Sequence, residues 1–250
     1  MKISIITATF NSEKHIESCL DSVFYQSFEN IEHIIVDGCS VDNTLQKIQN
    51  HKHRPNCVIS EKDDGIYDAL NKGVALSSGD IIGFLHSDDI YANSNTLKQI
   101  ISIFENDPTV DLVYGNLEYV SENDSKRVVR KWISRPFNSK LLKFGWMPPH
   151  PTIYFKRKIL DSKNIFNQNF RISADYMFIL EMFLKNDIKV RYIPDVLIKM
   201  TMGGISNRSL SSIILKSKED WIALYKNNFG FFGSTFALII KNLSKVKQFF

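Results

Sequence analysis

Two adjacent carboxylates, Asp88 and Asp89, follow the apolar run Ile81–Leu85, so they stand where a buried strand leaves the core. Adjacent acids repel each other, and a divalent cation relieves that repulsion. Carboxylate oxygens suit Mg²⁺ or Mn²⁺, which typically bind one or two carboxylates together with substrate phosphates. Taken alone, the pair is explained about as well by a solvated turn or by an N-cap of the helix expected at Asn95–Glu105.

Two further carboxylate clusters occupy comparable places. Asp37 ends an apolar run, and Asp63 and Asp64 precede Gly65. Each cluster alone is equally typical of a turn, with Asp42 capping the next helix in the first case. Three such clusters at the same edge of one sheet would be costly to assemble without a ligand, which favours a binding site.

The elements that must position these carboxylates are strand–helix–strand units. Short β-branched runs alternate with helical patterns through the first half, which predicts a mostly parallel sheet. The expected strands are Ile3–Thr9, Ile31–Asp37, Cys57–Ser60 and Asp80–Leu85, and the expected helices are Glu13–Gln26, Val41–Asn50 and Ile66–Leu76, the first of them capped by Asn11 or Ser12. In such a sheet ligands bind beyond the carboxyl ends of the strands.

After Tyr91 the alternation weakens. The patterns predict helices at Asn95–Glu105, Ala174–Lys185 and Ser209–Asn227, and strands at Leu112–Val120 and Val190–Pro194, whereas Lys126–Arg135 fits either period.

The charge of the chain is unevenly distributed. The 250 residues are 44% hydrophobic and carry a net charge of +4, which excludes a disordered tail or a disulfide-stapled miniprotein. Residues 1–124 carry a net charge of −12, whereas residues 125–160 contain ten Lys and Arg and no Asp or Glu. Such a charge map suggests separate tasks for separate regions.

The three cysteines and the apolar runs bear on location. Cys19, Cys39 and Cys57 lack any C-x-x-C spacing and lie in or beside apolar runs, which predicts buried thiols in a reducing compartment and no zinc site. The apolar start of the chain is too short for the core of a signal peptide, and no run reaches the ~20 apolar residues of a membrane span. We therefore expect a cytoplasmic protein, peripheral on the inner face of the cell membrane.

Four segments, in order and spacing, resemble the family 2 glycosyltransferases of the GT-A fold, especially the bacterial surface-polysaccharide enzymes. They are Ser4–Asn11, Ile34–Thr44, Ser60–Gly73 and Gly83–Asp89. The resemblance covers roughly residues 3–207 and implies an α/β, Rossmann-like, mostly parallel central sheet with helices on both faces. It places a GT-A domain at 1–207, with a nucleotide-sugar half at 1–124 and an acceptor half at 125–207, and a helical extension at 208–250.

The resemblance also implies roles on the donor side. Asp37 would accept a hydrogen bond from the base, usually uracil, and Asp63 would support the donor. The nucleoside pocket would be lined by Thr7, Thr9 and Asn11. Asp88 matches the last position of the D-x-D motif and would hold Mn²⁺ or Mg²⁺ on the diphosphate, helped by Asp89.

The first position of that D-x-D motif departs from the family. It is His86, which lacks the usual carboxylate or amide. A histidine there would contact ribose or a metal-bound water, and a histidine merely packed at a strand end is an equally good explanation.

On the acceptor side, the segment Phe170–Tyr176 resembles the one that carries the general base. Asp175 would deprotonate the acceptor hydroxyl in a single displacement with inversion, although Ala174 replaces the more usual Glu. The alternative for Asp175 is a first-turn acid favoured by the helix dipole.

Two other acceptor-side segments resemble family features. In Phe144–Thr152, Trp146 would stack on a sugar and His150 would face the crevice, and a proline-rich turn with a core tryptophan explains the segment nearly as well. Met202–Ser206 resembles a flexible segment that closes over the donor, or a simple turn.

The basic block and the C-terminal tail suggest the acceptor. The block contains aromatic residues but no recognised nucleic-acid module. A lipid-diphosphate-linked glycan at an anionic membrane surface would use the same charges, and a solvated basic face is the alternative. In the tail, apolar residues form one helical stripe, which would lie on the membrane or dock on the core. They are Phe232, Phe236, Ile239, Leu243, Val246 and Phe250.

The sequence and the resemblance therefore predict an inverting, metal-dependent hexosyltransferase that moves a sugar from a nucleotide-sugar, usually a UDP-sugar in the family that it resembles, onto a lipid-linked surface glycan such as O-antigen lipopolysaccharide, capsule or exopolysaccharide. Two alternatives remain. A non-catalytic nucleotide-sugar-binding subunit would explain His86 and Ala174. A sugar nucleotidyltransferase normally has a Gly-rich triphosphate loop near the first strand, and Thr7–Asn11 contains no glycine.

Overall fold

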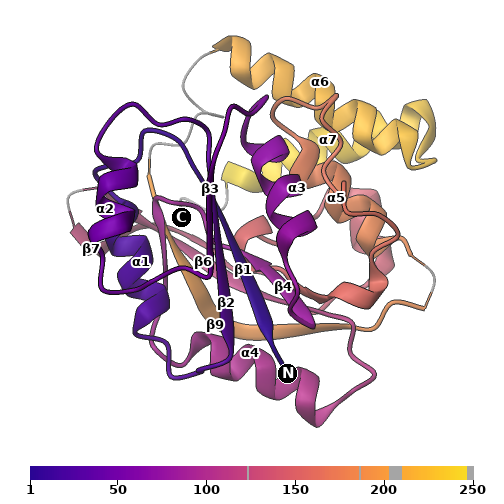
Figure 1. The fold of residues 1–250 in the computed structure, drawn as a ribbon. Coiled ribbons are helices and arrows are strands. Elements are labelled where there is room, and N and C mark those ends of the chain that lie inside the picture. Colours follow the sequence, from indigo (N-terminus) through magenta and orange to yellow (C-terminus); the bar gives the residue numbers. More distant parts are fainter. Residues whose placement is uncertain (123, 186, 203–209, 247–250) are drawn as a thin grey trace.

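The computed structural model describes residues 1–122, 124–185, 187–202 and 210–246. A single nine-stranded sheet runs through this part of the chain, with the order β3-β2-β1-β4-β8-β6-β9-β5 and with β7 paired to β6. Helices cover both faces of the sheet (Figure 1). The sheet is mostly parallel, as the sequence predicts, and it runs through both the 1–124 and the 125–207 halves.

The first part of the sheet is parallel throughout. β1 (Ile3–Thr9) pairs with β2 (Ile31–Asp37) and β4 (Ile81–Phe84), and β2 pairs with β3 (Cys57–Ser60). β1 is buried along its whole length because helices cover both of its faces, and for this reason it reads as a continuous apolar and β-branched run. The four predicted strands are confirmed here, with small differences at the ends of the last.

The second part of the sheet mixes directions. β6 (Leu112–Ser121) runs parallel to β9 (Val190–Thr201) and antiparallel to β7 (Asp124–Trp132) and β8 (Tyr154–Lys156), and β5 (Asp89–Tyr91) closes the edge against β9. β9 is longer than the predicted strand Val190–Pro194. The ambiguous basic segment forms β7, a largely exposed strand whose side chains alternate little in burial.

The helices of the first half are α1 (Ile16–Phe24), α2 (Thr44–Asn50), α3 (Ile66–Leu76) and α4 (Thr96–Asn106). α1 and α2 begin three residues later than the sequence predicts. The expected cap on α1 is wrong: neither Asn11 nor Ser12 caps it with a side chain, and the N-cap residue is His15. Asn11 instead accepts a hydrogen bond from the neighbouring loop, so a long-range contact replaces the local one.

The second half contains α5 (Ala174–Phe183), α6 (Leu210–Lys226) and α7 (Gly230–Val246), together with the short 3₁₀ helices η1 (Ser139–Phe144), η2 (His150–Thr152) and η3 (Arg157–Ile159). α3, α5, α6 and α7 gather on one side of the sheet, while α1 and α2 lie on the other (Figure 1). α7 packs closely against the end of η1. A Cβ at Gly145, the residue that follows η1, would lie 2.3 Å from the carbonyl oxygen of Ala237 in α7, so only glycine fits there.

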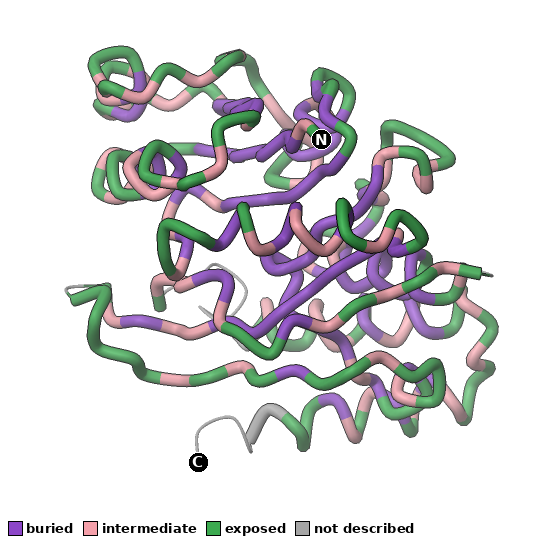
Figure 2. Tube along the Cα trace, turned by 90° about the horizontal axis from the view of Figure 1, so that it is seen from below, coloured by how far each residue is buried: buried purple, intermediate pink, exposed green. Residues whose placement is uncertain are grey.

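Burial follows this layering. The strands form a continuous buried interior, and the outer helix faces and connecting segments are exposed (Figure 2). Among the described residues, no helix combines the length and hydropathy that crossing a bilayer requires. The expectation of three buried thiols is wrong for Cys39, which is exposed in the loop after β2, whereas Cys19 is buried and Cys57 is half-buried.

Candidate active site

The carboxyl ends of the first strands meet at one edge of the sheet. Thr9 is in register with Asp37, and Asp37 is in register with Ser60. β4 ends beside β1, where the Leu85 amide donates to the Ile6 carbonyl. The parallel pairing therefore brings together the polar strand ends that the sequence singled out.

Asp37 is fully buried and organises the loop that follows β2. Its Oδ2 accepts hydrogen bonds from the Ser40 amide at 2.9 Å and the Ser60 hydroxyl at 2.7 Å, and its Oδ1 accepts one from the Ser40 hydroxyl. A carboxylate has about four acceptor positions, so one remains for a ligand.

Asn11 and Asp63 border the same loop from two sides. The Val41 amide donates to Asn11 Oδ1 at 2.9 Å, and the Asn11 amide donates to the Ser40 hydroxyl at 2.8 Å. Asn11 has a φ of 48°, a left-handed conformation that asparagine tolerates. Asp63 packs against Gly38, where a Cβ would lie 2.5 Å from its Oδ2. The two loops and Asp63 thus form one rim.

Thr7 and Thr9 occupy different depths of β1. The Thr7 hydroxyl lies 3.0 Å from His33 Nε2, inside the protein, so the structure does not bring this side chain to the rim. The expectation that Thr7 lines the pocket therefore fails, because a buried histidine engages its hydroxyl. Thr9, one pleat nearer the strand end, has a buried hydroxyl with no hydrogen-bond partner among the described residues.

The carboxylates after β4 differ in accessibility. Asp88 is partly exposed, and its carbonyl oxygen accepts a hydrogen bond from Thr201 at 2.7 Å. Asp89 begins β5 and is fully buried. Within the described residues neither of its carboxylate oxygens has a side-chain partner, and burial together with the charge of Asp88 raises its pKa well above the usual range.

The residues here fit a divalent cation. In the described part of the chain no three His, Cys, Asp or Glu side chains converge on a ready-made metal cage. Mg²⁺ and Mn²⁺ sites in nucleotide-dependent enzymes need only one or two carboxylates, because substrate phosphates supply other oxygens. The partly exposed Asp88, with the buried Asp89 beside it, meets that requirement.

Two histidines extend this edge toward α5. The rings of His86 and His150 are 6.0 Å apart, and His150 stacks on Phe84 at 5.4 Å. Burial lowers the pKa of both, that of His150 to about 4, so both imidazoles are neutral near pH 7. His86 Nδ1 and His150 Nε2 are buried, and the described residues offer them no partner.

Asp175 lies in the first turn of α5 at the same edge. The Tyr67 hydroxyl is 2.6 Å from the Ile172 carbonyl oxygen and 3.3 Å from Asp175 Oδ1. Burial and the Asp175 charge raise the pKa of Tyr67 well above its usual value, so its hydroxyl stays protonated. Asp88 and Asp175 both act on His86, each raising its pKa against the larger effect of burial.

Trp146 does not reach this edge. Its ring packs against Tyr114, Phe137 and Phe183, with centroids 5.8 to 6.0 Å away. The core tryptophan that the sequence allowed as an alternative is therefore the arrangement observed, and sugar stacking by Trp146 is not supported. Of the expected closing segment Met202–Ser206, residues 203–206 lie outside the described residues.

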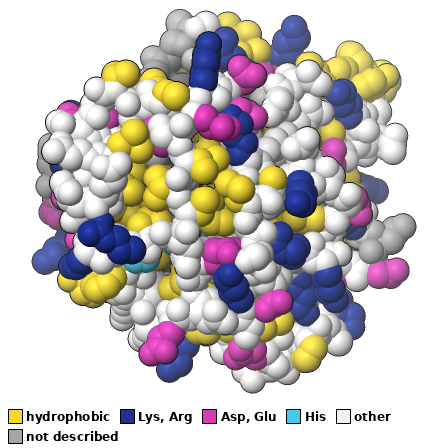
Figure 3. All heavy atoms as spheres, viewed as in Figure 1, with side chains coloured by type: hydrophobic (Ala, Val, Ile, Leu, Met, Phe, Trp, Pro, Cys, Tyr) yellow, Lys and Arg dark blue, Asp and Glu magenta, His cyan; other side chains and the backbone are white. Residues whose placement is uncertain are grey.

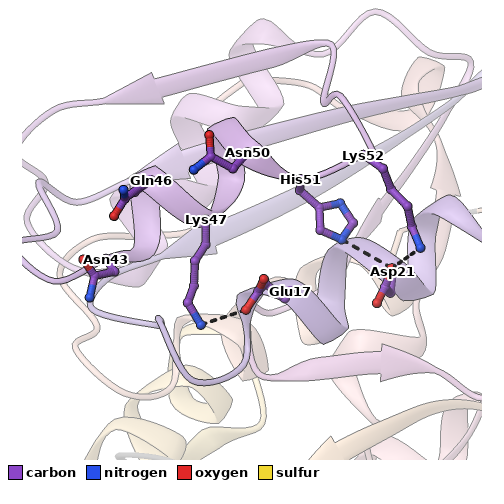
Figure 4. A pocket seen from close by; sticks show the side chains of 8 residues that line it. All are labelled: Glu17, Asp21, Asn43, Gln46, Lys47, Asn50, His51 and Lys52. Carbon is purple, nitrogen blue, oxygen red and sulfur yellow. Dashed lines mark hydrogen bonds and ion pairs between the residues drawn. The ribbon is translucent and has the colours of Figure 1, made fainter.

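Another hollow, of about 500 Å³, lies between α1 and α2. It contains none of the predicted site residues, and its charges neutralise one another (Figure 4): Lys47 pairs with Glu17 at 2.7 Å, and His51 and Lys52 pair with Asp21. The lysines and carboxylates of this surface are therefore engaged with one another, and the amide side chains of Asn43, Gln46 and Asn50 line the rest of it.

Tyr67 is a site residue that sequence reasoning missed. It lies inside the quoted segment Ser60–Gly73, yet its partner Asp175 is 108 positions away. The sequence feature that could have suggested a role for Tyr67 is its position near the start of α3, just after the polar segment Asp63–Gly65 that follows β3.

Comparisons with known proteins agree with this geometry. The sequence profile described as Glycosyl transferase family 2 matches residues 4–168. A PGL/p-HBAD biosynthesis glycosyltransferase of Mycobacterium bovis (strain BCG / Pasteur 1173P2) is 32% identical over 220 residues, which cover 85% of this chain and 82% of that protein.

Solved structures share the fold. S. aureus TarS 1–349 in complex with UDP-GlcNAc superimposes with a TM-score of 0.67 at 21% identity, covering 92% of this chain and 73% of that one. The mannosyltransferase PcManGT of Pyrobaculum calidifontis, in complex with GDP-Man and Mn²⁺, has a TM-score of 0.67 at 16% identity, covering 98% of this chain and 74% of that one.

Proposed function

Because this chain belongs to glycosyltransferase family 2, we propose that its nucleotide-sugar transfer is metal-dependent and inverting, with a UDP-sugar as donor and a lipid-diphosphate-linked surface glycan as acceptor. The observation that carries the proposal is the position of His86. Asp88 and Asp175 both raise the pKa of His86, and its ring lies 6.0 Å from that of His150, which supports placing the donor carboxylate and the proposed base in one centre.

The donor half of the proposal rests on the rim built by the loops after β1 and β2. Asp37 keeps one acceptor position for the N–H of a base, and the buried Thr9 hydroxyl, which has no hydrogen-bond partner among the described residues, would bind the nucleoside. Asn11 holds the two loops together, and Asp63 supports the rim from the segment that follows β3. Uracil fits one remaining carboxylate acceptor because it presents a single imide N–H.

The diphosphate would lie beside Asp88, with Asp89 behind it. A cation bound there would supply Lewis-acid neutralisation of the leaving nucleoside diphosphate, an effect worth several kcal/mol of transition-state stabilisation. Asp88 is the residue placed to hold it, because its side chain is partly exposed at the strand end. Burial and the charge of Asp88 favour the neutral form of Asp89, so Asp88 carries the charge of this pair.

The base in this mechanism is Asp175. Its carboxylate takes the proton of the acceptor hydroxyl while that oxygen attacks the anomeric carbon. The bond from that carbon to the diphosphate oxygen breaks, and its electron pair leaves with the nucleoside diphosphate. The sugar is thus transferred in one displacement, with inversion. Such a base typically contributes ~10²–10⁴-fold.

The exposed apolar side chains of α7 support the proposal that the protein binds a membrane surface, where a lipid-linked acceptor would lie. The stripe residues Phe232, Phe236, Ile239 and Leu243 are exposed, Phe232 by 86%, so along the described part of the stripe docking on the core is not what the structure contains. Figure 3 shows a hydrophobic group at the upper right, where α6 and α7 lie in Figure 1. The side chains of Val246 and Phe250 lie outside the description.

Charge complementarity supports an anionic bilayer as the occupant of this face. Lys140 and Lys143 are exposed on η1, which packs against α7, and Phe144 of η1 contacts Phe236 with ring centroids 5.9 Å apart. A lysine near an anionic membrane contributes about 1 kcal/mol to binding. Basic and apolar side chains on one face match the headgroup and acyl layers of such a surface.

The test is transfer by the wild-type chain and its Asp175→Asn variant. We expect product of inverted anomeric configuration from the wild type, and in the variant a rate about 10²–10⁴-fold lower with unchanged donor affinity. A non-catalytic binding subunit would give no product from wild type, and a nucleotidyltransferase would release pyrophosphate from a nucleoside triphosphate. Either result would overturn the proposal.

A further inference from the structure

Glu219 of α6 binds the backbone that leads into α5. Its Oε1 accepts a hydrogen bond from the Arg171 amide at 2.9 Å, and its Oε2 accepts bonds from the Ile172 and Ser173 amides, each at 2.8 Å. Asp175 stands two residues beyond Ser173. We propose that Glu219 is a positioning residue for Asp175, and this inference rests on the role of Asp175 as the base in the proposed function.

The local geometry explains why a carboxylate is needed. The N-cap residue of α5, Ser173, makes no side-chain capping hydrogen bond, so the amides that approach the helix lack a local acceptor. Glu219 supplies one from another helix, at the positive end of the α5 dipole. It is only 6% exposed, and charge-assisted hydrogen bonds in such a place are roughly twice as strong as neutral ones.

The helix that carries Glu219 is itself fixed. Asp220 forms a buried ion pair with Lys241 of α7 at 2.9 Å, and Trp221 Nε1 donates to Thr235 of α7 at 3.2 Å. The Lys241 ammonium also lies 3.0 Å from the ring centroid of Tyr176, the residue after Asp175. The α6–α7 pair thus contacts the base segment through Glu219, before Asp175, and through Lys241, at the residue after it.

The base segment is held from the opposite side by Tyr67, whose hydroxyl lies 2.6 Å from the Ile172 carbonyl oxygen. Ile172 is therefore bound through its amide by α6 and through its carbonyl by α3. Loss of the Glu219 carboxylate leaves three amides without their acceptor, and the base segment then keeps only the contact between Tyr67 and the Ile172 carbonyl of the two described here. Displacement of a catalytic group by about 1 Å can cost 10²-fold in rate.

Glu219 lies outside residues 4–168, the part of the chain that the family profile matches. The inference therefore assigns part of the catalytic centre to the C-terminal extension. On this account the extension completes the active site in addition to presenting the exposed face of α7.

The test compares Glu219→Gln in two backgrounds. The glutamine has one acceptor oxygen, and its NH₂ group would face an amide N–H. In the otherwise wild-type chain we expect kcat to fall between about 10- and 100-fold, with the donor KM changed less than twofold. In the Asp175→Asn background the same substitution should cost less than about twofold, because Glu219 acts through Asp175.

The matched control is Glu181→Gln, an exposed glutamate farther along α5, which should leave kcat unchanged in both backgrounds. Equal losses from Glu219→Gln with and without Asp175 would overturn the inference, since they indicate a purely structural role. If Asp175→Asn alone retains full transfer, the proposed base is wrong, which is a separate failure.

Hydrogen exchange on the wild-type chain guards against a variant that fails to fold. The amides of Arg171, Ile172 and Ser173 should be protected to the degree of the sheet core, and in Glu219→Gln they should lose protection while β1 keeps it. Rapid exchange of these amides in the wild type would contradict the inference without any variant.

Discussion

The hydroxyl oxygen of Tyr67 lies 3.3 Å from Oδ1 of Asp175, although the two residues are 108 positions apart. The same hydroxyl is 2.6 Å from the Ile172 carbonyl oxygen. With one proton to donate, Tyr67 serves mainly the carbonyl and stays close to the carboxylate. A tyrosine of α3, in the donor half, thereby fixes the place of an acid in the acceptor half.

Replacing this tyrosine by phenylalanine should slow transfer without weakening donor binding. The Tyr67→Phe variant loses one buried hydrogen bond, worth about 0.5–1.5 kcal/mol, so we expect kcat to fall roughly 2- to 10-fold. Steady-state kinetics with varied donor and acceptor would measure it. Tyr25→Phe, at an exposed tyrosine beyond α1, is the matched control and should change nothing. A rise in donor KM with constant kcat would contradict this role.

The sequence located the strands better than the helix starts. β1, β2, β3 and α3 have the predicted bounds. β1 and β2 are buried parallel strands and α3 has a regular apolar face, whereas β3 is an edge strand that alternates between half-buried and exposed residues. α1 and α2 begin late because Asn11 and Asp42 bind neighbouring backbone: Asn11 accepts from Val41, and Asp42 from Glu13 and Thr44.

The residues of the candidate site also fall into those that the sequence could locate and those that it could not. Residues at strand ends, such as Asp37 and Asp88, could be found from the sequence because the strand order brings their positions together. Tyr67 and Glu219 could not, because their partners lie far away in the chain and no periodic pattern records them. Trp146 and Thr7 were misplaced because residue type alone does not distinguish a ligand-facing ring or hydroxyl from a packed one.

Buried neutral histidines make stability depend on pH. Burial lowers the pKa of His150 from 6.5 to about 4, and burial with the charge of His53 lowers that of His33 to about 3. The unfolded chain binds these protons more readily, so the free energy of unfolding should fall as the pH drops below about 6.5 and continue to fall toward about 4 and 3.

The variant His150→Asn isolates one of these contributions. Asparagine does not titrate, so between about pH 7 and pH 4 the variant should lose about 3 kcal/mol less stability than the wild type. Urea unfolding at the two pH values would measure the difference. Equal losses for the two proteins would show that His150 is not the buried neutral group described here.

The exposed face of α7 predicts binding to anionic vesicles. A triple variant, Phe232→Ser, Phe236→Ser and Leu243→Ser, removes apolar side chains that make no part of the core, so it should fold normally and float much less with phosphatidylglycerol vesicles. The control replaces Val41 and Leu76, which are exposed elsewhere, by serine. Equal flotation of the triple variant and the wild type would contradict membrane docking through α7.

Vesicle charge provides a second contrast for the same face. Because Lys140 and Lys143 on η1 are attracted to anionic lipid, binding should be weaker on neutral phosphatidylcholine vesicles. Binding to anionic vesicles should also weaken in high salt, which screens exposed charges. Binding that is indifferent to vesicle charge and salt would leave only the apolar contribution and would contradict the selection of an anionic surface.

The central claim is that Asp88 belongs to a metal-dependent nucleotide-sugar site, in the same centre as the proposed base Asp175. Thermal unfolding with a panel of donors tests the metal-dependent site most directly. The panel consists of UDP-, GDP- and dTDP-sugars, each with and without Mn²⁺, on the wild type and on Asp88→Asn. We predict that a UDP-sugar raises the melting temperature most, that Mn²⁺ increases this shift, and that Asp88→Asn abolishes the metal-dependent part. No metal-dependent stabilisation of the wild type by any of these donors would contradict the account.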